Sequence, residues 1–435
     1  MYKQYFKQAW NLMRQNRFYS GVYIIGTGLA ISMVMVIAIV YHIRTADITP
    51  EVHRGKYLYI DQMKYERGKG NSNFFWGIRS AKECLMPLKS AKEVALMTNT
   101  AITSLLYGDT YVQIPGGDDP QKVQVMGTNN SFWRLFSFSF VEGKPFSEEE
   151  FQSGFPRVVV SESLARRIFS TATGVTGKSI LLDDTEYSVS GVVKDVSAVT
   201  PSVYADMWVP YTSMPLVMGA SDERDVSVGL LTVCILPADG MGVDEVSREL
   251  EEMIDRYNTT LADGKLSMMN GVETHLTHVV RQFVMGGSVT AVYLMLLFLI
   301  FLFLLIPALN LSGLNASRMQ DRISELGVRK AFGARKNRLL TQILIENLLL
   351  MLPGGLVGLL VSYGMVALFQ QLLLTPGIIA MVQGSVQTEL TVGMLLSPAV
   401  FGYAFLVCFL LNLMSSMIPA WRAIRVNITE SLNHY

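Results

Sequence analysis

The sequence is poor in the residues that hold metals and disulfides. Three cysteines and five histidines occur among 435 residues. Cys84, Cys234 and Cys408 are far apart in the sequence; a Cys84–Cys234 disulfide is possible, and the alternative is three ordinary buried thiols. His275 and His278 have the i, i+3 spacing of helical metal ligands, but no third ligand stands near them in the sequence. We therefore predict no metal site in this chain.

Catalytic motifs are missing as well. No Ser/His/Asp or Cys/His set can be assembled from the sequence with any specificity. Gly177-Lys178-Ser179 looks like the end of a phosphate-binding loop, but Ala172 takes the place of the first glycine. A strand pattern follows, so no helix N-terminus would meet a phosphate. We therefore predict a non-catalytic chain with no cofactor of its own.

What the sequence has instead is apolar length. Half of its residues are hydrophobic, and its mean hydropathy is +0.32. A helix needs roughly 20 apolar residues to cross a bilayer. Four segments reach that length, and we predict a transmembrane helix in each of them: 21–43, 287–312, 346–374 and 394–418. The first exceeds the roughly 7–15 apolar residues of a cleaved signal peptide, so we predict an anchor that is retained.

The charges divide the connecting segments, although the net charge of the chain is zero. Segments 1–20, 313–345 and 419–435 together carry 13 basic and 3 acidic residues, whereas 44–286 carries 23 basic and 31 acidic ones. The loop 375–393 has no Lys or Arg. Because basic loops stay in the cytoplasm, we predict cytoplasmic N and C termini and an extracytoplasmic location for 44–286 and 375–393.

The large segment 44–286 alternates between strand and helix patterns, which predicts an α+β domain of two subdomains. Its middle part, about 105–225, is richer in strands and is predicted to be the inserted subdomain. Glu148, Glu149 and Glu150 are predicted to begin a helix or to face solvent, and a cation site is the alternative. The other local predictions are a helix from Phe74 to Leu88, a helix capped by Ser161 that ends at Phe169, a hairpin turning at Asp183-Asp184, a helix over 241–260 and a stalk over 272–290.

Two patterns concern helix packing at the membrane. Residues 1–20 place apolar side chains at helical spacing among basic ones, which predicts an amphipathic helix at the membrane surface. Gly354, Gly358 and Ser362 repeat every four residues in the third apolar segment, a pattern that lets two helices approach closely. This small-residue face packs either on a second copy of the chain or on another span of the same chain.

The basic loop before the third apolar segment has a helical pattern of its own. Glu325 and Arg329 stand one turn apart in the stabilising order. Gly333 is placed to end this helix, and a second helix is predicted to begin near Lys336 and to run into the membrane. We interpret 313–345 as a rigid cytoplasmic element that is presented to a partner.

This loop, with the sequence ISELGVRKAFGARKNRLLTQILIENLLL, resembles the hallmark of MacB/FtsX-type ABC transporter permeases, to which the LolC/LolE type is similar. The segments NSFWRLFSFSFVEGKPF, VVVSESLARRIFS, GKSILLDDTEYSVSGVVKDV and WVPYTS follow in the order of a MacB-like periplasmic core domain. The resemblance covers essentially the whole chain. It implies a membrane α-helical protein of type VII ABC architecture, with two four-span permeases and two cytoplasmic ATPase subunits that bind ATP and magnesium.

The resemblance also implies which residues couple the chain to the ATPase. The residues that would face the ATPase are Glu325, Gly327, Arg329, Lys330, Gly333 and Ala334. The residues that would begin the connecting helix are Leu339, Gln342 and Glu346. The MacB protein itself carries a fused ATPase domain, and this sequence has none, so we expect the ATPase to be a separate subunit.

These features predict the permease subunit of an ATP-driven export or mechanotransmission complex in a bacterial inner membrane, with its large domain in the periplasm. The implied partners are the ATPase, membrane lipid, a second permease copy in a homo- or heterodimer, and a periplasmic adaptor or outer-membrane protein; no nucleic acid is expected. The alternative is an FtsX-like regulator that relays force to a periplasmic hydrolase without transport. Lipoprotein, peptide, lipid and drug substrates all stay open.

Overall fold

The chain forms two compact units. The computed structural model describes residues 17–68, 70–183, 185–222, 228–282, 288–320, 336–374 and 397–425, and the single positions 328, 331, 332 and 334. Unit 1 comprises 1–43, 288–373 and 390–435, and unit 2 comprises 44–287 and 374–389. The predicted amphipathic helix lies outside the described residues up to position 16, and so does the loop 375–393.

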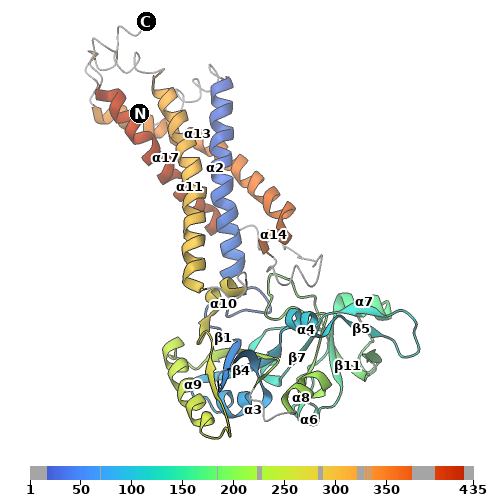
Figure 1. The fold of residues 1–435 in the computed structure, drawn as a ribbon. Coiled ribbons are helices and arrows are strands. Elements are labelled where there is room, and N and C mark those ends of the chain that lie inside the picture. Colours follow the sequence, from blue (N-terminus) through green and yellow to red (C-terminus); the bar gives the residue numbers. More distant parts are fainter. Residues whose placement is uncertain are drawn as a thin grey trace. The chain divides into compact units, whose positions relative to one another are not determined.

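Unit 1 is helical (Figure 1). Its helices are α2 (Arg17–Thr45, whose last two residues belong to unit 2), α11 (Val289–Gln320), α13 (Lys336–Leu368), α14 (Gln370–Leu374) and α17 (Pro398–Arg425). Two stretches, Ser20–Thr45 and Met351–Leu368, are long and apolar enough to cross a membrane, while Val289–Leu302 and Pro398–Leu411 are shorter apolar helices. Four transmembrane spans therefore stay a prediction.

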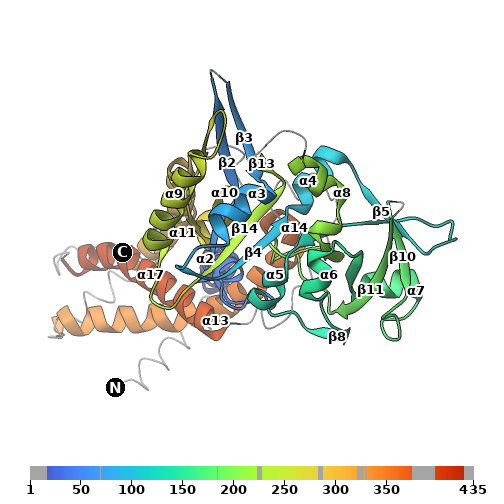
Figure 2. The same cartoon turned by 90° about the horizontal axis from the view of Figure 1, so that it is seen from below.

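Unit 2 is an α+β domain built on a single mixed sheet, as Figure 2 shows. Its sixteen described strands follow the order β15-β2-β3-β14-β4-β7-β12-β9-β11-β10-β5-β6, with β1, β8, β13 and β16 attached beside this path. Most neighbours are antiparallel, whereas β7–β12 and β9–β11 are parallel. The strands are β1 (Leu58–Ile60), β2 (Gln62–Arg67), β3 (Gly70–Trp76), β4 (Ala91–Thr98), β5 (Thr110–Gln113), β6 (Gln121–Val123), β7 (Val125–Thr128), β8 (Phe140–Gly143), β9 (Arg157–Ser161), β10 (Ser179–Leu182), β11 (Thr185–Val193), β12 (Met207–Pro210), β13 (Val228–Gly229), β14 (Leu231–Pro237), β15 (Lys265–Met268) and β16 (Glu273–Thr274).

Short helices cover this sheet, and several begin where the sequence predicts. Ser161 accepts a hydrogen bond from the Leu164 amide and caps α7, which confirms the predicted cap. Glu148 to Glu150 begin α6, and the Ser147–Glu150 capping box fixes its start. The helices of unit 2 are α3 (Ile78–Ser80) with a π-helical turn at Ala81–Leu85, α4 (Thr100–Tyr107), α5 (Asn130–Leu135), α6 (Glu148–Gln152), α7 (Glu162–Phe169), the 3-10 turn Tyr211–Ser213, α8 (Pro215–Asp222), α9 (Val243–Asn258) and α10 (His275–Gln282).

One local prediction is wrong at its start. The segment predicted as helical from Phe74 begins in strand β3, and its helix starts only at Ile78. Trp76 pairs with Leu231 of β14 and is fully buried. Pairing with this strand and burial of the indole stabilise the extended conformation more than the local helical pattern stabilises a helix.

The sheet joins the flanking parts of the domain to its middle part. Met97 of β4 pairs with Thr128 of β7, so the hydrogen-bonded ladder passes from one part to the other. A cluster with Trp76, Leu250 and Ile254 fills the space between α9 and the flanking strands. A second cluster with Val160, Leu164 and Ile180 lies in the middle part. The predicted hairpin at Asp183-Asp184 is present as the β10–β11 pair.

Candidate functional site

Few of the residues predicted to couple the chain to an ATPase lie in the described part of the chain. Glu325, Gly327, Arg329, Lys330 and Gly333 are outside it. The four that are described follow one another closely: Ala334 is half-buried just before α13, Leu339 is 3% exposed on α13, and Gln342 and Glu346 continue that helix. Helix α13 begins at Lys336, as the sequence predicts.

The small-residue face of α13 packs on α2 within the same chain. A Cβ added to Gly358 would lie 2.8 Å from the Gly28 carbonyl oxygen and 2.8 Å from the Ile31 Cβ. At Gly354 an added Cβ would lie 3.0 Å from the Thr27 Cβ. Ser362 is fully buried and donates its hydroxyl to the Leu359 carbonyl at 2.8 Å. Of the two alternatives, the described helices thus place the intrachain partner against this face.

A buried ion pair that the sequence reasoning missed stands where α2 enters unit 2. The Arg54 Nε lies 2.7 Å from the Glu51 Oε2, and the two side chains are 1% and 0% exposed. Arg54 also donates to the carbonyl oxygens of Ala46 at 3.1 Å and of Val199 at 2.8 Å. The guanidinium therefore ties the start of the domain to the loop before β12. A single Glu–Arg pair in a polar linker gives no sequence signal of such burial.

Helix α10 docks on the same region through its histidines. The His275 Nε2 lies 3.1 Å from the Arg44 carbonyl oxygen at the end of α2. The His278 ring stacks on Tyr59 of β1, with ring centroids 4.1 Å apart and planes 8° from parallel. Next to it, the Arg281 Nε donates to the Glu273 Oε1 at 2.6 Å. The pair of histidines that the sequence singles out thus holds α10 to the backbone of α2 and to the sheet.

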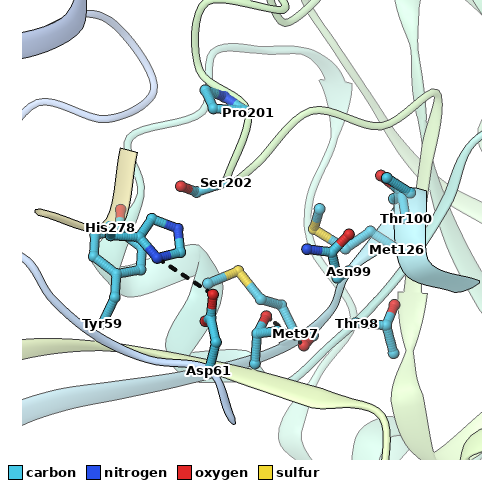
Figure 3. Close-up of a pocket in the computed structure, with 12 residues that line it drawn as sticks. Tyr59, Asp61, Met97, Thr98, Asn99, Thr100, Met126, Pro201, Ser202 and His278 are labelled. Atoms are coloured by element: carbon cyan, nitrogen blue, oxygen red, sulfur yellow. Dashed lines mark hydrogen bonds and ion pairs between the residues drawn. The ribbon is translucent and has the colours of Figure 1, made fainter. Parts of the chain in front are cut away.

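Asp61 completes this cluster, as Figure 3 shows. Its Oδ2 lies 3.3 Å from the His278 Nδ1. Burial raises the pKa of the Asp61 carboxyl to about 7 and lowers the pKa values of His275 and His278 to about 4, because each charged form loses its hydration. Among the described residues, no three His, Cys, Asp or Glu side chains are grouped to hold a metal ion.

A cavity of about 40 Å³ opens beside this pair. The sheet lines it with Tyr59, Met97 and Thr232, and the first turn of α4 lines it with Thr100 and Ala101. One buried polar atom of its wall, the Asp61 Oδ1, has no hydrogen-bond partner in the described part of the chain. The cavity wall therefore offers hydrogen-bond donors and acceptors, which suits the binding of water and the exchange of a proton.

None of the three cysteines is paired in a disulfide. Cys84 and Cys234 are both buried and free, so the disulfide left open by the sequence is not formed in the structure. Burial raises the pKa of the Cys84 thiol to about 12, which keeps it protonated and unreactive.

The described residues combine apolar helices, two of them long and apolar enough to cross a membrane, with a mixed α+β unit that follows the first of these helices in the chain. The MacB-like periplasmic core domain family matches residues 20–253, and the FtsX-like permease C-terminal family matches residues 297–428. The chain therefore belongs to the MacB-like, FtsX-like permease family of ABC transporters.

Characterised and uncharacterised relatives agree with this membership. The chain is 24% identical to the uncharacterised ABC transporter permease YknZ of Bacillus subtilis (strain 168), over 71% of this chain and 70% of that protein. It is 28% identical to the macrolide export ATP-binding/permease protein MacB of Sodalis glossinidius, over 72% of this chain. The match spans only 43% of MacB and 42% of the pyoverdine export protein PvdT of Pseudomonas savastanoi, so the chain corresponds to less than half of these relatives.

Solved structures of related domains are similar at low identity. The extracellular domain of YknZ matches 48% of this chain and 98% of that domain, with 14% identity and a TM-score of 0.35. The periplasmic region of MacB from Actinobacillus actinomycetemcomitans matches 52% of this chain and 94% of that region, with 14% identity and a TM-score of 0.34.

Proposed function

We propose that this chain is the membrane permease subunit of an ATP-driven export or mechanotransmission complex, with ATP bound and hydrolysed by a separate cytoplasmic subunit. The observation that carries the proposal is the order of parts in one chain: a MacB-like core domain over 20–253 and an FtsX-like permease region over 297–428. Such a chain has a body outside the membrane and a membrane part that an ATPase can move.

The contacts at the base of unit 2 support a mechanical role. Arg44 at the end of α2 is bonded to His275 of α10, and α10 is held on β1 by the stack of His278 on Tyr59. In this proposal, a displacement of the end of α2 or of α10 is passed to the sheet through these short contacts. Packed interiors resist gradual deformation, so such a displacement moves the domain as a body.

The cytoplasmic end of the proposed pathway is the loop 313–345. A partner can shift the conformation of the permease only through contacts that differ between its nucleotide states. In our proposal Glu325 and Arg329 lie on the element that makes these contacts, and α13 carries the motion from Lys336 toward its apolar part.

The test is reconstitution of the full chain with its ATPase in lipid nanodiscs. The double variant Glu325→Ala, Gly327→Leu should lose ATPase binding or most of the permease-dependent change in ATP hydrolysis. Arg166→Ala is the matched control, since it removes one exposed charge of unit 2 from an ordinary i, i+4 pair with Glu162. Unchanged assembly and unchanged coupled hydrolysis in the double variant would refute the proposal.

Capture of a peptidoglycan hydrolase by unit 2, with no transported cargo, would favour the alternative function, a regulator that relays force to that hydrolase.

A further inference from the structure

We propose that the Asp61–His278 pair and the cavity beside it form a proton-binding site, and that one proton held there fastens α10 to the sheet. This goes beyond the proposed function and does not depend on it, because the site and its test lie within unit 2. The geometry that carries it is a carboxylate and an imidazole 3.3 Å apart, next to a cavity at which the Asp61 Oδ1 has no hydrogen-bond partner among the described residues.

The charge of the Asp61–His278 pair depends on how many protons it holds. With one proton shared between Asp61 and His278 the pair is neutral overall, either as acid and imidazole or as carboxylate and imidazolium. With no shared proton the pair carries a negative charge, and with two it carries a positive one. The His278 side chain is 6% exposed and the Asp61 side chain 21% exposed, and this burial disfavours both charged states, so the singly protonated pair is the stable one. The pKa values of about 7 for Asp61 and about 4 for His278 bound this neutral state on its two sides.

The surrounding charges do not remove this preference. Arg281 faces the pair from α10 and is paired with Glu273 of β16; burial, the larger cause, raises the pKa of Asp61 although the charge of Arg281 lowers it. Glu51 and Arg54 form an ion pair, so their charges largely cancel. The remaining titratable neighbours are neutral at ordinary pH: His275 from α10, and Tyr59 and Cys234 from β1 and β14, whose pKa values burial raises well above their usual ones.

The cavity gives the proton a route to and from the pair. The cavity of about 40 Å³ has room for water molecules, since one needs roughly 10–15 Å³. The Asp61 Oδ1 is the group that such water would bond. The pair can therefore exchange its proton through the cavity without α10 leaving the sheet.

The proton is linked to α10 through the ring of His278. His278 contributes both the stack on Tyr59 and the bond to Asp61, so α10 is held by the same ring that shares the proton. If α10 lifts, Asp61 becomes hydrated and its pKa returns toward that of a free carboxyl. By linkage, the docked state is favoured most where the pair is singly protonated, and loss of the proton above neutral pH loosens α10.

The test is hydrogen exchange of α10 in the full-length protein, with exchange corrected for the intrinsic rate. His275 and His278 titrate in the opposite sense, so the readout is the ratio of α10 protection in wild type to that in Asp61→Asn. Asparagine stays uncharged and can donate a hydrogen bond as the protonated acid does. This ratio should fall about tenfold from about pH 6 to about pH 8. In the matched control Asp263→Asn, which changes an exposed carboxylate of unit 2, the same ratio should stay flat.

A second measurement keeps the proposal testable if Asp61→Asn does not fold. Infrared spectra of wild type labelled with carbon-13 aspartate should contain the carbonyl band of a buried protonated carboxyl at about pH 6 and lose it by about pH 8. The His278→Gln variant should shift the midpoint of that loss. A flat protection ratio in a folded Asp61→Asn protein, or no protonated carboxyl in wild type at about pH 6, would overturn the proposal.

Discussion

At the residue scale, the most consequential side chain is one whose role only the fold reveals. Arg54 is 1% exposed and is satisfied by the Glu51 carboxylate and by the carbonyl oxygens of Ala46 and Val199. A lone buried charge costs far more than the pair does, because nothing then offsets the lost hydration. Arg54 therefore makes the domain sensitive to its own loss without adding much net stability.

We expect Arg54→Met to lower the free energy of unfolding by about 3–5 kcal/mol, since it leaves Glu51 charged and unpaired. The double variant Glu51→Leu, Arg54→Met should lose less than Arg54→Met alone, because no charge is left stranded. Chemical unfolding of the full chain in detergent measures both.

The exposed pair Arg67–Asp263 is the control, with side chains 68% and 60% exposed. Arg67→Met should cost much less than Arg54→Met, since water screens this pair. An equal loss in Arg67→Met and Arg54→Met would contradict the role of burial.

The histidines predict a dependence of stability on acid. Burial lowers the pKa values of His275 and His278 to about 4, below the 6.5 of a free histidine. The unfolded chain then binds more protons than the folded one between about pH 6.5 and about pH 4, so stability falls as the pH drops through that window. His278→Gln should remove its share of this loss, up to about 3 kcal/mol. Unfolding of wild type and variant at about pH 4.5 and about pH 7 would show it, and equal pH slopes would count against it.

At the element scale, the sequence predicts best where the cause is local. Ser161 and Glu150 indicate helix starts because each forms its capping hydrogen bond with a residue three positions away. The end of β3 is missed because the partner of Trp76 is Leu231, far along the chain. The contact of His275 with Arg44 joins residues 231 positions apart, and no periodicity in either segment encodes it. The candidate site is made almost entirely of such distant contacts.

Helix α13 gives a prediction about its packing on α2. Gly358→Val should destabilise the full chain by about 1–3 kcal/mol, because the new side chain meets the Gly28 carbonyl and Ile31 with no flexible group to yield. Gly364→Ala on the same helix is the control: nothing lies within 4 Å of its added Cβ, and alanine favours helix. Thermal unfolding in one detergent compares them. A stable Gly358→Val protein would mean that α2 and α13 do not pack at this face.

At the scale of the whole molecule, composition and charge indicate the architecture more securely than any single motif. The length of an apolar segment can be recognised without knowing what it packs against. Basic residues gather in segments 1–20 and 313–345, whereas acidic residues gather in 44–286. Segment lengths and charge totals change little when a single helix or strand is wrongly predicted. The division into an apolar helical part and an α+β part therefore follows from them. The sheet order does not, since β7–β12 and β9–β11 pair in parallel across intervening strands and helices.

The opposite sides of the membrane predicted for the loop 313–345 and for unit 2 can be tested directly. Cys84, Cys234 and Cys408 are buried, so they compete little with an introduced surface thiol. In spheroplasts, a membrane-impermeant maleimide should label Glu186→Cys, at an exposed position of β11, without lysis. Lys330→Cys should react only after the membrane is opened, because basic loops are retained in the cytoplasm. Labelling of both variants in intact spheroplasts would place the loop and the domain on one side, and an ATPase in the cytoplasm could then not act on one to move the other.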